Sequence, residues 1–286
     1  MSGPGPALVS TEWLAGRLDR PGLVVLDGSA YLPASGRDPA AEYAAGHIPG
    51  AVFFDVDATS DRDSALPHML PSPEAFAERM AALGIADDDH VVVYDGSGVN
   101  LSAPRVWWMF RVMGHDRVSL LDGGLGRWRR EGRPLEAGVW RRPPARFTPR
   151  PRPGAVRDLD AVRAALESGS EQVVDMRSAG RFAGAEPEPR PGLRGGHMPG
   201  SLNLPFDQLV AEDGTLLPPE RLRSRIAAAG IDPARPVVAT CGSGLSACAL
   251  IFALHLLGRD DVTLYDGAWT EWGGRPDTPV ESGEPA

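Results

Sequence analysis

The residues best suited to chemistry in this sequence surround Cys241, which directly follows the β-branched run Val237–Thr240. Gly242 and Gly244 allow the backbone to turn tightly around the sulfur atom, and we expect an apolar helix from about Ser246 to Leu257. The N-terminal end of that helix would direct unpaired N–H groups and the positive end of its dipole towards the sulfur. This setting favours the thiolate, which is the form of cysteine that acts as a nucleophile.

An inert, buried cysteine is the alternative interpretation, because free cysteine is among the most buried residue types. An inert core thiol does not need glycines beside it on a strand-to-helix turn, so this interpretation suits Cys241 poorly. The second cysteine, Cys248, lies inside the apolar stretch Ala247–Phe252. We therefore interpret Cys248 as a core residue.

The composition limits the other chemistry that the chain can perform. All 29 basic residues are arginines, so a Schiff-base lysine and the lysine of a phosphate-binding loop are excluded. The six histidines and two cysteines contain no close pair at metal-ligand spacing. We therefore expect no metal site and no cofactor.

The charge and the cysteine content also limit the partners and the compartment. The net charge of −9 would repel nucleic acid and anionic membranes, so neither is expected as a partner. Two cysteines are too few for a disulfide framework, the segment Met1–Pro6 has no secretory leader, and the apolar run Ala247–Leu257 is too short to span a bilayer. These features predict a protein of a reducing compartment, the cytoplasm.

The sequence contains an internal duplication, since several short motifs recur in the same order in its two halves. The matching segments are Gly46–Ala51 with Gly196–Ser201, Val24–Asp27 with Val173–Asp175, and Leu121–Gly123 plus Trp128 with Tyr265–Gly267 plus Trp272. The repeated turn residues His47 and His197 are interpreted as maintaining the fold, as are Asp27 and Asp175 at the strand ends. An internal repeat of this kind predicts two similar domains.

A segment rich in proline and arginine, residues 141–155, separates the two copies and is unsuited to helix or central strand. We predict a first domain over residues 1–140, a linker over 141–155 and a catalytic domain over 156–286. Within each copy, short strands such as Val91–Tyr94 and Val118–Leu121 alternate with helical stretches such as Pro73–Leu83 and Leu159–Leu166. This alternation predicts an α/β fold in which each domain has a mainly parallel sheet flanked by helices.

The first copy repeats the strand and the glycine loop but carries Asp95 where the second copy carries Cys241. A carboxylate cannot carry sulfur and would repel an anionic substrate. We therefore expect one active site per chain, with a structural and cleft-forming role for the first copy.

With these landmarks, the chain resembles the tandem rhodanese-like sulfurtransferases, and 3-mercaptopyruvate sulfurtransferases in particular, over nearly its whole length. The resemblance implies a persulfide-cradling loop made of Gly242, Ser243, Gly244, Leu245, Ser246 and Ala247. Leu245 and Ser246 stand where the family usually has valine and threonine. Thiosulfate sulfurtransferases of this fold typically carry basic residues just after the cysteine, whereas Gly242 and Ser243 are neutral, which favours mercaptopyruvate as the donor.

The resemblance also implies the other site residues. Arg181 and Arg190 match the family's substrate-binding arginines, and a guanidinium fork suits the carboxylate and keto oxygen of a small α-keto acid. Asp57 and His68 match segments that supply a carboxylate and an imidazole near the active-site serine, here Ser243. The implied relay would tune proton delivery to the departing carbon. Without the resemblance, the two arginines could equally well be exposed loop residues, and the sequence alone would favour a structural role for His68.

The implied reaction transfers sulfur from 3-mercaptopyruvate to Cys241 and then to a thiophile such as cyanide, a small thiol or thioredoxin. Thiosulfate:cyanide sulfurtransfer through the same persulfide is the principal alternative. A cysteine phosphatase would need an arginine where Ala247 stands, and a non-catalytic rhodanese-like binding module would not be expected to keep Cys241. These alternatives remain for experiment to separate.

Overall fold

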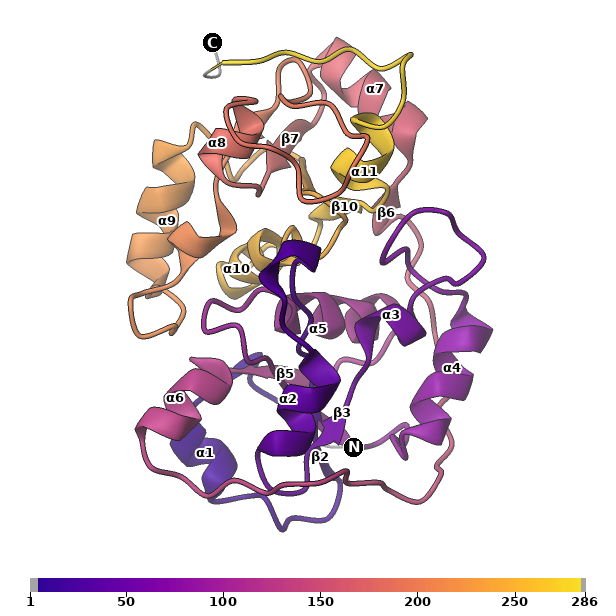
Figure 1. Ribbon diagram of the computed structural model, residues 1–286, viewed down its shortest axis with the longest axis vertical. Coiled ribbons are helices and arrows are strands. Elements are labelled where there is room, and N and C mark those ends of the chain that lie inside the picture. Colours follow the sequence, from indigo (N-terminus) through magenta and orange to yellow (C-terminus); the bar gives the residue numbers. More distant parts are fainter. Residues whose placement is uncertain (1–4, 284–286) are drawn as a thin grey trace.

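The structure is a computed structural model that describes residues 5–283. Part of the segment Met1–Pro6, where we expect no leader, and the outer limits of the two predicted domains lie outside the described residues. Within residues 5–283 the chain forms two five-stranded sheets with helices packed around them (Figure 1). No helix in this range is long and apolar enough to cross a membrane.

The first half of the chain builds one sheet, whose strands lie in the order β1-β5-β4-β2-β3 with every neighbouring pair parallel. Its elements are β1 (Leu8–Val9), α1 (Thr11–Ala15), β2 (Leu23–Asp27), the 3-10 helix η1 (Pro33–Ser35), α2 (Pro39–Ala45), β3 (Val52–Phe53), α3 (Val56–Thr59), α4 (Pro73–Ala82), β4 (His90–Tyr94), α5 (Ala103–Val112), β5 (Val118–Leu121) and α6 (Gly124–Arg130).

The second half repeats this topology in a parallel sheet of order β6-β10-β9-β7-β8. Its elements are β6 (Val156–Arg157), α7 (Leu159–Ser168), β7 (Gln172–Asp175), α8 (Ala179–Phe182), β8 (Leu202–Asn203), the 3-10 helix η2 (Phe206–Leu209), α9 (Pro219–Ala228), β9 (Val237–Thr240), α10 (Cys248–Leu256), β10 (Thr263–Tyr265) and α11 (Ala268–Trp272). The predicted α/β fold with two parallel-sheet domains is confirmed.

The repeated turns show the duplication at the level of side chains. His47 and His197 are both buried, and the Nδ1 atom of each lies 2.9 Å from a backbone carbonyl oxygen, that of Tyr43 and Phe182 respectively. Each imidazole stacks on the ring of that same residue, with centroids 4.1 Å apart in the first copy and 3.8 Å in the second. These contacts agree with a fold-maintaining role for both histidines.

Local sequence signals explain where the helices begin. Ser72 accepts a hydrogen bond from the N–H of Ala75 and precedes a proline, so α4 starts at Pro73. The expected start of α10 at Ser246 is wrong by two residues. The N–H groups of Cys248, Ala249 and Leu250 bond to carbonyls three residues earlier, so a tighter turn of 3-10 type precedes the helix and keeps Ser246 in the loop.

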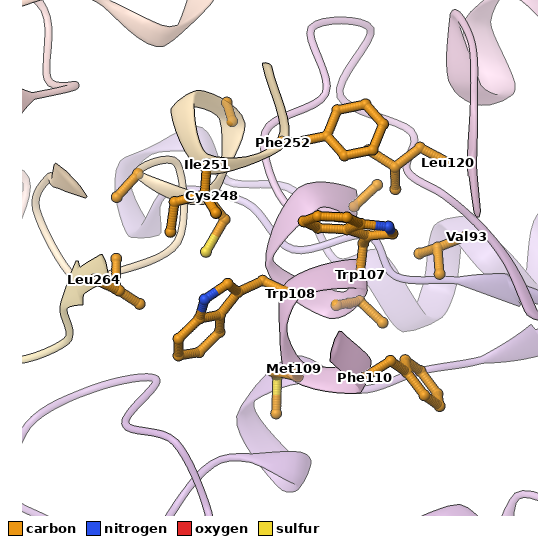
Figure 2. Packing of buried hydrophobic residues seen from close by; sticks show 14 of the residues in the cluster. Val93, Trp107, Trp108, Met109, Phe110, Leu120, Cys248, Ile251, Phe252 and Leu264 are labelled. Atoms are coloured by element: carbon orange, nitrogen blue, oxygen red, sulfur yellow. The ribbon is translucent and has the colours of Figure 1, made fainter. Parts of the chain in front are cut away.

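The two halves share one continuous hydrophobic core, in which α5 of the first half packs against α10 of the second between the two sheets (Figure 1). At the centre, the rings of Trp107 and Phe252 meet edge to face with centroids 4.9 Å apart (Figure 2). Cys248 also points into this core and is fully buried. Burial raises the pKa of its thiol, as expected for an unreactive core cysteine.

The predicted linker, residues 141–155, contains neither helix nor strand and runs along the first half of the chain. Its backbone donates hydrogen bonds from Ala145 to the carbonyl of Ala81, at 3.0 Å, and from Arg150 to that of Met113, at 2.7 Å. The ring of Phe147 is buried in the shared core. The segment is therefore extended but fixed in place, while the domain limits drawn around it stay a prediction.

We expect Phe252→Ala to lower the free energy of unfolding by about 3–5 kcal/mol, because it empties the centre of the shared core. Urea denaturation would measure this loss. The control Val139→Ala alters a side chain that is 65% exposed and should change stability by no more than about 0.5 kcal/mol. A loss as small as that of the control would contradict the shared core.

Candidate functional site

Cys241 lies at the carboxyl end of β9, where ligands of parallel α/β sheets usually bind, and it is 2% exposed. The carbonyls of Cys241 and Gly242 accept hydrogen bonds from the N–H groups of Trp269 and Thr270 in α11, at 2.9 and 3.0 Å. The Thr270 hydroxyl also donates to the Gly242 carbonyl, at 2.6 Å. Within the described range, the N–H groups of residues 242–247 form no hydrogen bond. The loop thus holds free donors beside the sulfur.

The two glycines of this loop serve different purposes. Gly244 has a φ of +74°, and a Cβ there would lie 2.8 Å from Asp266 Oδ1 and 3.3 Å from Arg105 Nη1. Gly242 is required for space, because a Cβ there would lie 2.9 Å from Arg181 Nη2. The tight turn predicted from both glycines therefore depends on Gly244, whereas Gly242 admits the guanidinium.

A histidine from the first half of the chain reaches the loop. His68 Nδ1 lies 2.9 Å from Ser243 Oγ, and its Nε2 lies 3.1 Å from Asp57 Oδ1. When Nε2–H donates to Asp57, Nδ1 can accept the Ser243 hydroxyl proton; Nδ1 also lies 3.3 Å from the Ser243 carbonyl oxygen. The bond from His68 lowers the pKa of Asp57, whose side chain is 81% exposed. His68 and Ser243 are both buried.

Arg181 lies beside the loop and is held by a carboxylate that the sequence did not reveal. Its Nη2 atom lies 2.5 Å from Glu188 Oε2, and the other oxygen of Glu188 lies 2.6 Å from Arg177 Nη1. The Glu188 side chain is 2% exposed, so both guanidinium groups are fixed by a buried acceptor. Arg177 is itself paired with Asp175 at the end of β7, which explains the carboxylate at that strand end.

Arg190 differs from Arg181 because its guanidinium forms no hydrogen bond or ion pair with any residue in the range 5–283. It is half-buried, and this burial lowers its pKa, whereas the nearby Cys241 and Asp57 raise it. A partly buried cation without a carboxylate partner, next to a thiol, is suited to bind an anionic group.

The structure therefore brings the predicted site residues together from both halves of the chain. Asp57 comes from α3 and His68 from the loop between α3 and α4, and the remaining residues come from the second half. The latter are Arg181, Arg190, Cys241, Gly242, Ser243, Gly244, Leu245, Ser246 and Ala247. Their functional roles stay predictions. The sequence alone predicted no roles for Trp269, Thr270 and Glu188. The repeated motif Asp266-Gly267 with Trp272 did, however, single out the segment that forms α11.

Comparison with known proteins identifies the family. The model of the rhodanese-like domain matches residues 10–131 and 158–275. The chain belongs to the rhodanese-like family. It is 46% identical to human 3-mercaptopyruvate sulfurtransferase over 97% of this chain and 96% of the relative, and 44% identical to bovine thiosulfate sulfurtransferase over 97% and 96%. The crystal structure of SseA from Escherichia coli, a 3-mercaptopyruvate sulfotransferase, superposes with a TM-score of 0.85 at 42% identity, covering 93% of this chain and 99% of SseA.

The first rhodanese-like domain fills its own loop with a carboxylate. Asp95 is buried and accepts hydrogen bonds from the N–H groups of Ser97, Ser102 and Ala103, each at 2.9 Å, and from the Ser97 hydroxyl at 2.5 Å. In the first loop the N–H groups of residues 96, 97, 99 and 101 are bonded to the side chains of Ser29, Asp95 and Ser97, whereas the N–H groups of their counterparts, residues 242, 243, 245 and 247, are free in the second. The first loop thus holds a buried, hydrogen-bonded carboxyl group where the second holds Cys241.

A cavity of about 650 Å³ lies between the two rhodanese-like domains, towards the C-terminal ends of α5 and α10. Cys241 lies at the opposite, N-terminal end of α10. The cavity is lined by arginines that already have carboxylate partners, such as Arg111 with Asp116 and Asp260. It is therefore separate from the sulfur chemistry, and its cations are already neutralised.

Gly244→Ala should destabilise the protein more than Gly98→Ala, which is its counterpart in the first domain. Gly98 has a φ of +80° and open space around its Cα, so alanine there should cost about 1–2 kcal/mol for the left-handed backbone alone. At Gly244 the contact with Asp266 adds about 1–3 kcal/mol. Urea unfolding of both variants would test this, and equal losses would contradict the close packing described at Gly244.

Proposed function

We propose that this protein is a sulfurtransferase that moves sulfur from 3-mercaptopyruvate, through a persulfide at Cys241, to a thiophilic acceptor and releases pyruvate. The observation that carries the proposal is the hydrogen-bonded series Asp57, His68 and Ser243 beside the cysteine. Pyruvate leaves as an enolate that needs a proton on carbon, whereas sulfite leaves thiosulfate as a stable dianion. A proton relay is thus useful for mercaptopyruvate and unnecessary for thiosulfate.

Overall identity does not separate these two donors, because relatives named for each match this chain almost equally, at 46% and 44%. The site itself supports the choice. Gly242 and Ser243 leave the loop without the basic residues that are typical of thiosulfate enzymes. The cations that remain near the sulfur, Arg181 and Arg190, are suited to a carboxylate and a keto oxygen.

The first half-reaction balances with the groups present in the site. The Cys241 thiolate attacks the sulfur of mercaptopyruvate, the carbon–sulfur bond breaks, and its electron pair passes to C3 as the enolate of pyruvate. The proton lost from the substrate thiol equals the proton gained by C3, so no net acid is consumed. Ser243 and His68 can carry this proton, and Asp57 holds the imidazole in the required tautomer.

The persulfide left on Cys241 carries its negative charge on the outer sulfur. The free N–H groups of residues 242–247 would stabilise that charge, by the same electrostatic principle as an oxyanion hole. In the second half-reaction, cyanide, a small thiol or reduced thioredoxin takes the outer sulfur and restores the thiolate. A reducing cytoplasm suits this free thiolate, and we propose that location.

Thiosulfate:cyanide sulfurtransfer is the second candidate, and the guanidinium of Arg190, which has no carboxylate partner among residues 5–283, is compatible with it. This cation would also bind the anionic sulfonate end of thiosulfate. A non-catalytic binding module is less consistent with the site, because such a module needs neither Cys241 nor the relay that faces it. The donor preference of the enzyme therefore decides between the candidates.

The wild-type protein should release pyruvate from 3-mercaptopyruvate with a higher kcat/KM than it forms thiocyanate from thiosulfate, with cyanide as acceptor in both assays. Cys241→Ser should abolish both reactions, because a hydroxyl cannot form the persulfide. The matched control Cys248→Ala removes the fully buried thiol and should keep the donor preference. Preference for thiosulfate would move the protein to the second candidate.

Arg190→Ala should raise the KM for mercaptopyruvate by about 10- to 100-fold, the effect of losing one charge-assisted hydrogen bond to the substrate carboxylate. Arg181→Ala should have a smaller effect, because Glu188 already shares that guanidinium. Arg190→Lys keeps the charge but loses the fork, so its KM should lie between those of wild type and Arg190→Ala. Equal changes with both donors would show that Arg190 is a general anion contact.

A further inference from the structure

A third arginine, Arg105, reaches the site from the opposite domain without facing the sulfur. It lies on α5 of the first domain and its side chain is fully buried at the interface. Its Nη1 atom lies 2.6 Å from Asp266 Oδ1, at the end of β10, and 3.3 Å from the carbonyl oxygen of Gly244. Its Nη2 atom donates to the carbonyl oxygen of His68, at 2.5 Å.

These contacts fix both partners of the hydrogen bond between His68 and Ser243. Gly244 directly follows Ser243, so the hydrogen bond from Arg105 to the Gly244 carbonyl also restrains the backbone of the serine. In the first domain, the N–H of Leu70 donates a hydrogen bond to the second oxygen of Asp266, at 2.6 Å. The ion pair of Arg105 and Asp266 therefore holds the chain at both His68 and Leu70. Arg105 and Asp266 therefore join the first-domain loop to the second-domain loop.

The backbone conformation of His68 is one that the surrounding hydrogen bonds have to maintain. Its φ is +61°, in the left-handed region that few residues other than glycine adopt. Such a conformation persists when the surroundings determine it from several directions. The hydrogen bonds from Arg105 to the His68 carbonyl and from Leu70 to Asp266 supply two of these restraints, and they orient the imidazole towards Ser243.

The ion pair is well suited to act as a rigid anchor. Burial lowers the pKa of Arg105, whereas the Asp266 carboxylate and the Cys248 thiol raise it, and the pKa is raised overall. The guanidinium also lies 4.6 Å from the centroid of the Trp108 ring. A paired, fully buried guanidinium has little freedom to move, so the groups bonded to it are held in register.

We propose that Arg105, with Asp266, is a positioning residue for the proton relay, which holds His68 Nδ1 against Ser243 Oγ across the domain interface. This inference rests on the proposed function, because it assigns the relay to the mercaptopyruvate half-reaction. Arg105 does not touch the reacting atoms in this account. Its removal should therefore impair proton delivery while leaving Cys241 able to take sulfur from a donor that needs no proton.

The test compares Arg105→Met with Ser243→Ala, with both donors and cyanide as acceptor. Arg105→Met should lower kcat for mercaptopyruvate by about tenfold or more, and change kcat for thiosulfate by less than about threefold. Combining it with Ser243→Ala should cause little further loss, because both substitutions disable the same relay. Arg105→Lys, which keeps one charged donor, should recover part of the mercaptopyruvate rate.

Arg111→Met is the matched control, since Arg111 lies on the same helix and also pairs across the interface, with Asp260 at 3.4 Å. It should leave the ratio of the two donor rates unchanged. If Arg105→Met does not fold, as judged by thermal unfolding, Asp266→Asn carries the same test with a nearly isosteric side chain.

Equal losses with both donors, multiplicative losses in the double variant, or the same donor split in Arg111→Met would overturn the positioning role. The proposed function itself would fail if the wild-type protein released no pyruvate from mercaptopyruvate. The wild-type assay thus separates the two failures before any variant is compared.

Discussion

The proposed mechanism places a negative charge on the sulfur of Cys241, a residue that is only 2% exposed, and such a charge has to be stabilised by its surroundings. The chain has no lysine to supply a counter-charge. It turns the carbonyls of Cys241 and Gly242 towards α11, which leaves the N–H groups of the loop free. Arg190 adds a cation without a carboxylate partner among residues 5–283. Backbone donors and one guanidinium thus provide positive potential near the sulfur.

The two copies of the fold have divided the work of one site. The second provides Cys241 and its loop. The first holds Asp95 at the corresponding position and contributes His68, which contacts Ser243 across the interface, and Asp57, which contacts His68. His68 can reach Ser243 only because α5 and α10 pack into one core and fix the domains against each other. The hydrophobic interface therefore helps to fix the geometry of the proposed site.

The sequence was sufficient to predict the features that depend on short-range patterns. These include strand β5, the duplicated topology and the position of Cys241 at the carboxyl end of a strand, while the family resemblance pointed to His68. The start of α10 was missed because a tight turn around the sulfur overrides the helical pattern at Ser246. Glu188 and Arg105 were missed for another reason. Their partners are fixed by tertiary packing, and no spacing along the chain marks a contact between residues 105 and 266.

The central claim is that Cys241 takes sulfur from mercaptopyruvate and holds it as a persulfide. The most direct test mixes the protein with 3-mercaptopyruvate in the absence of an acceptor, and follows pyruvate release together with the mass of the Cys241 and Cys248 peptides. The account predicts one equivalent of pyruvate per chain and the added mass of one sulfur atom on Cys241 alone. Pyruvate release without sulfur on Cys241, or sulfur on Cys248, would contradict it.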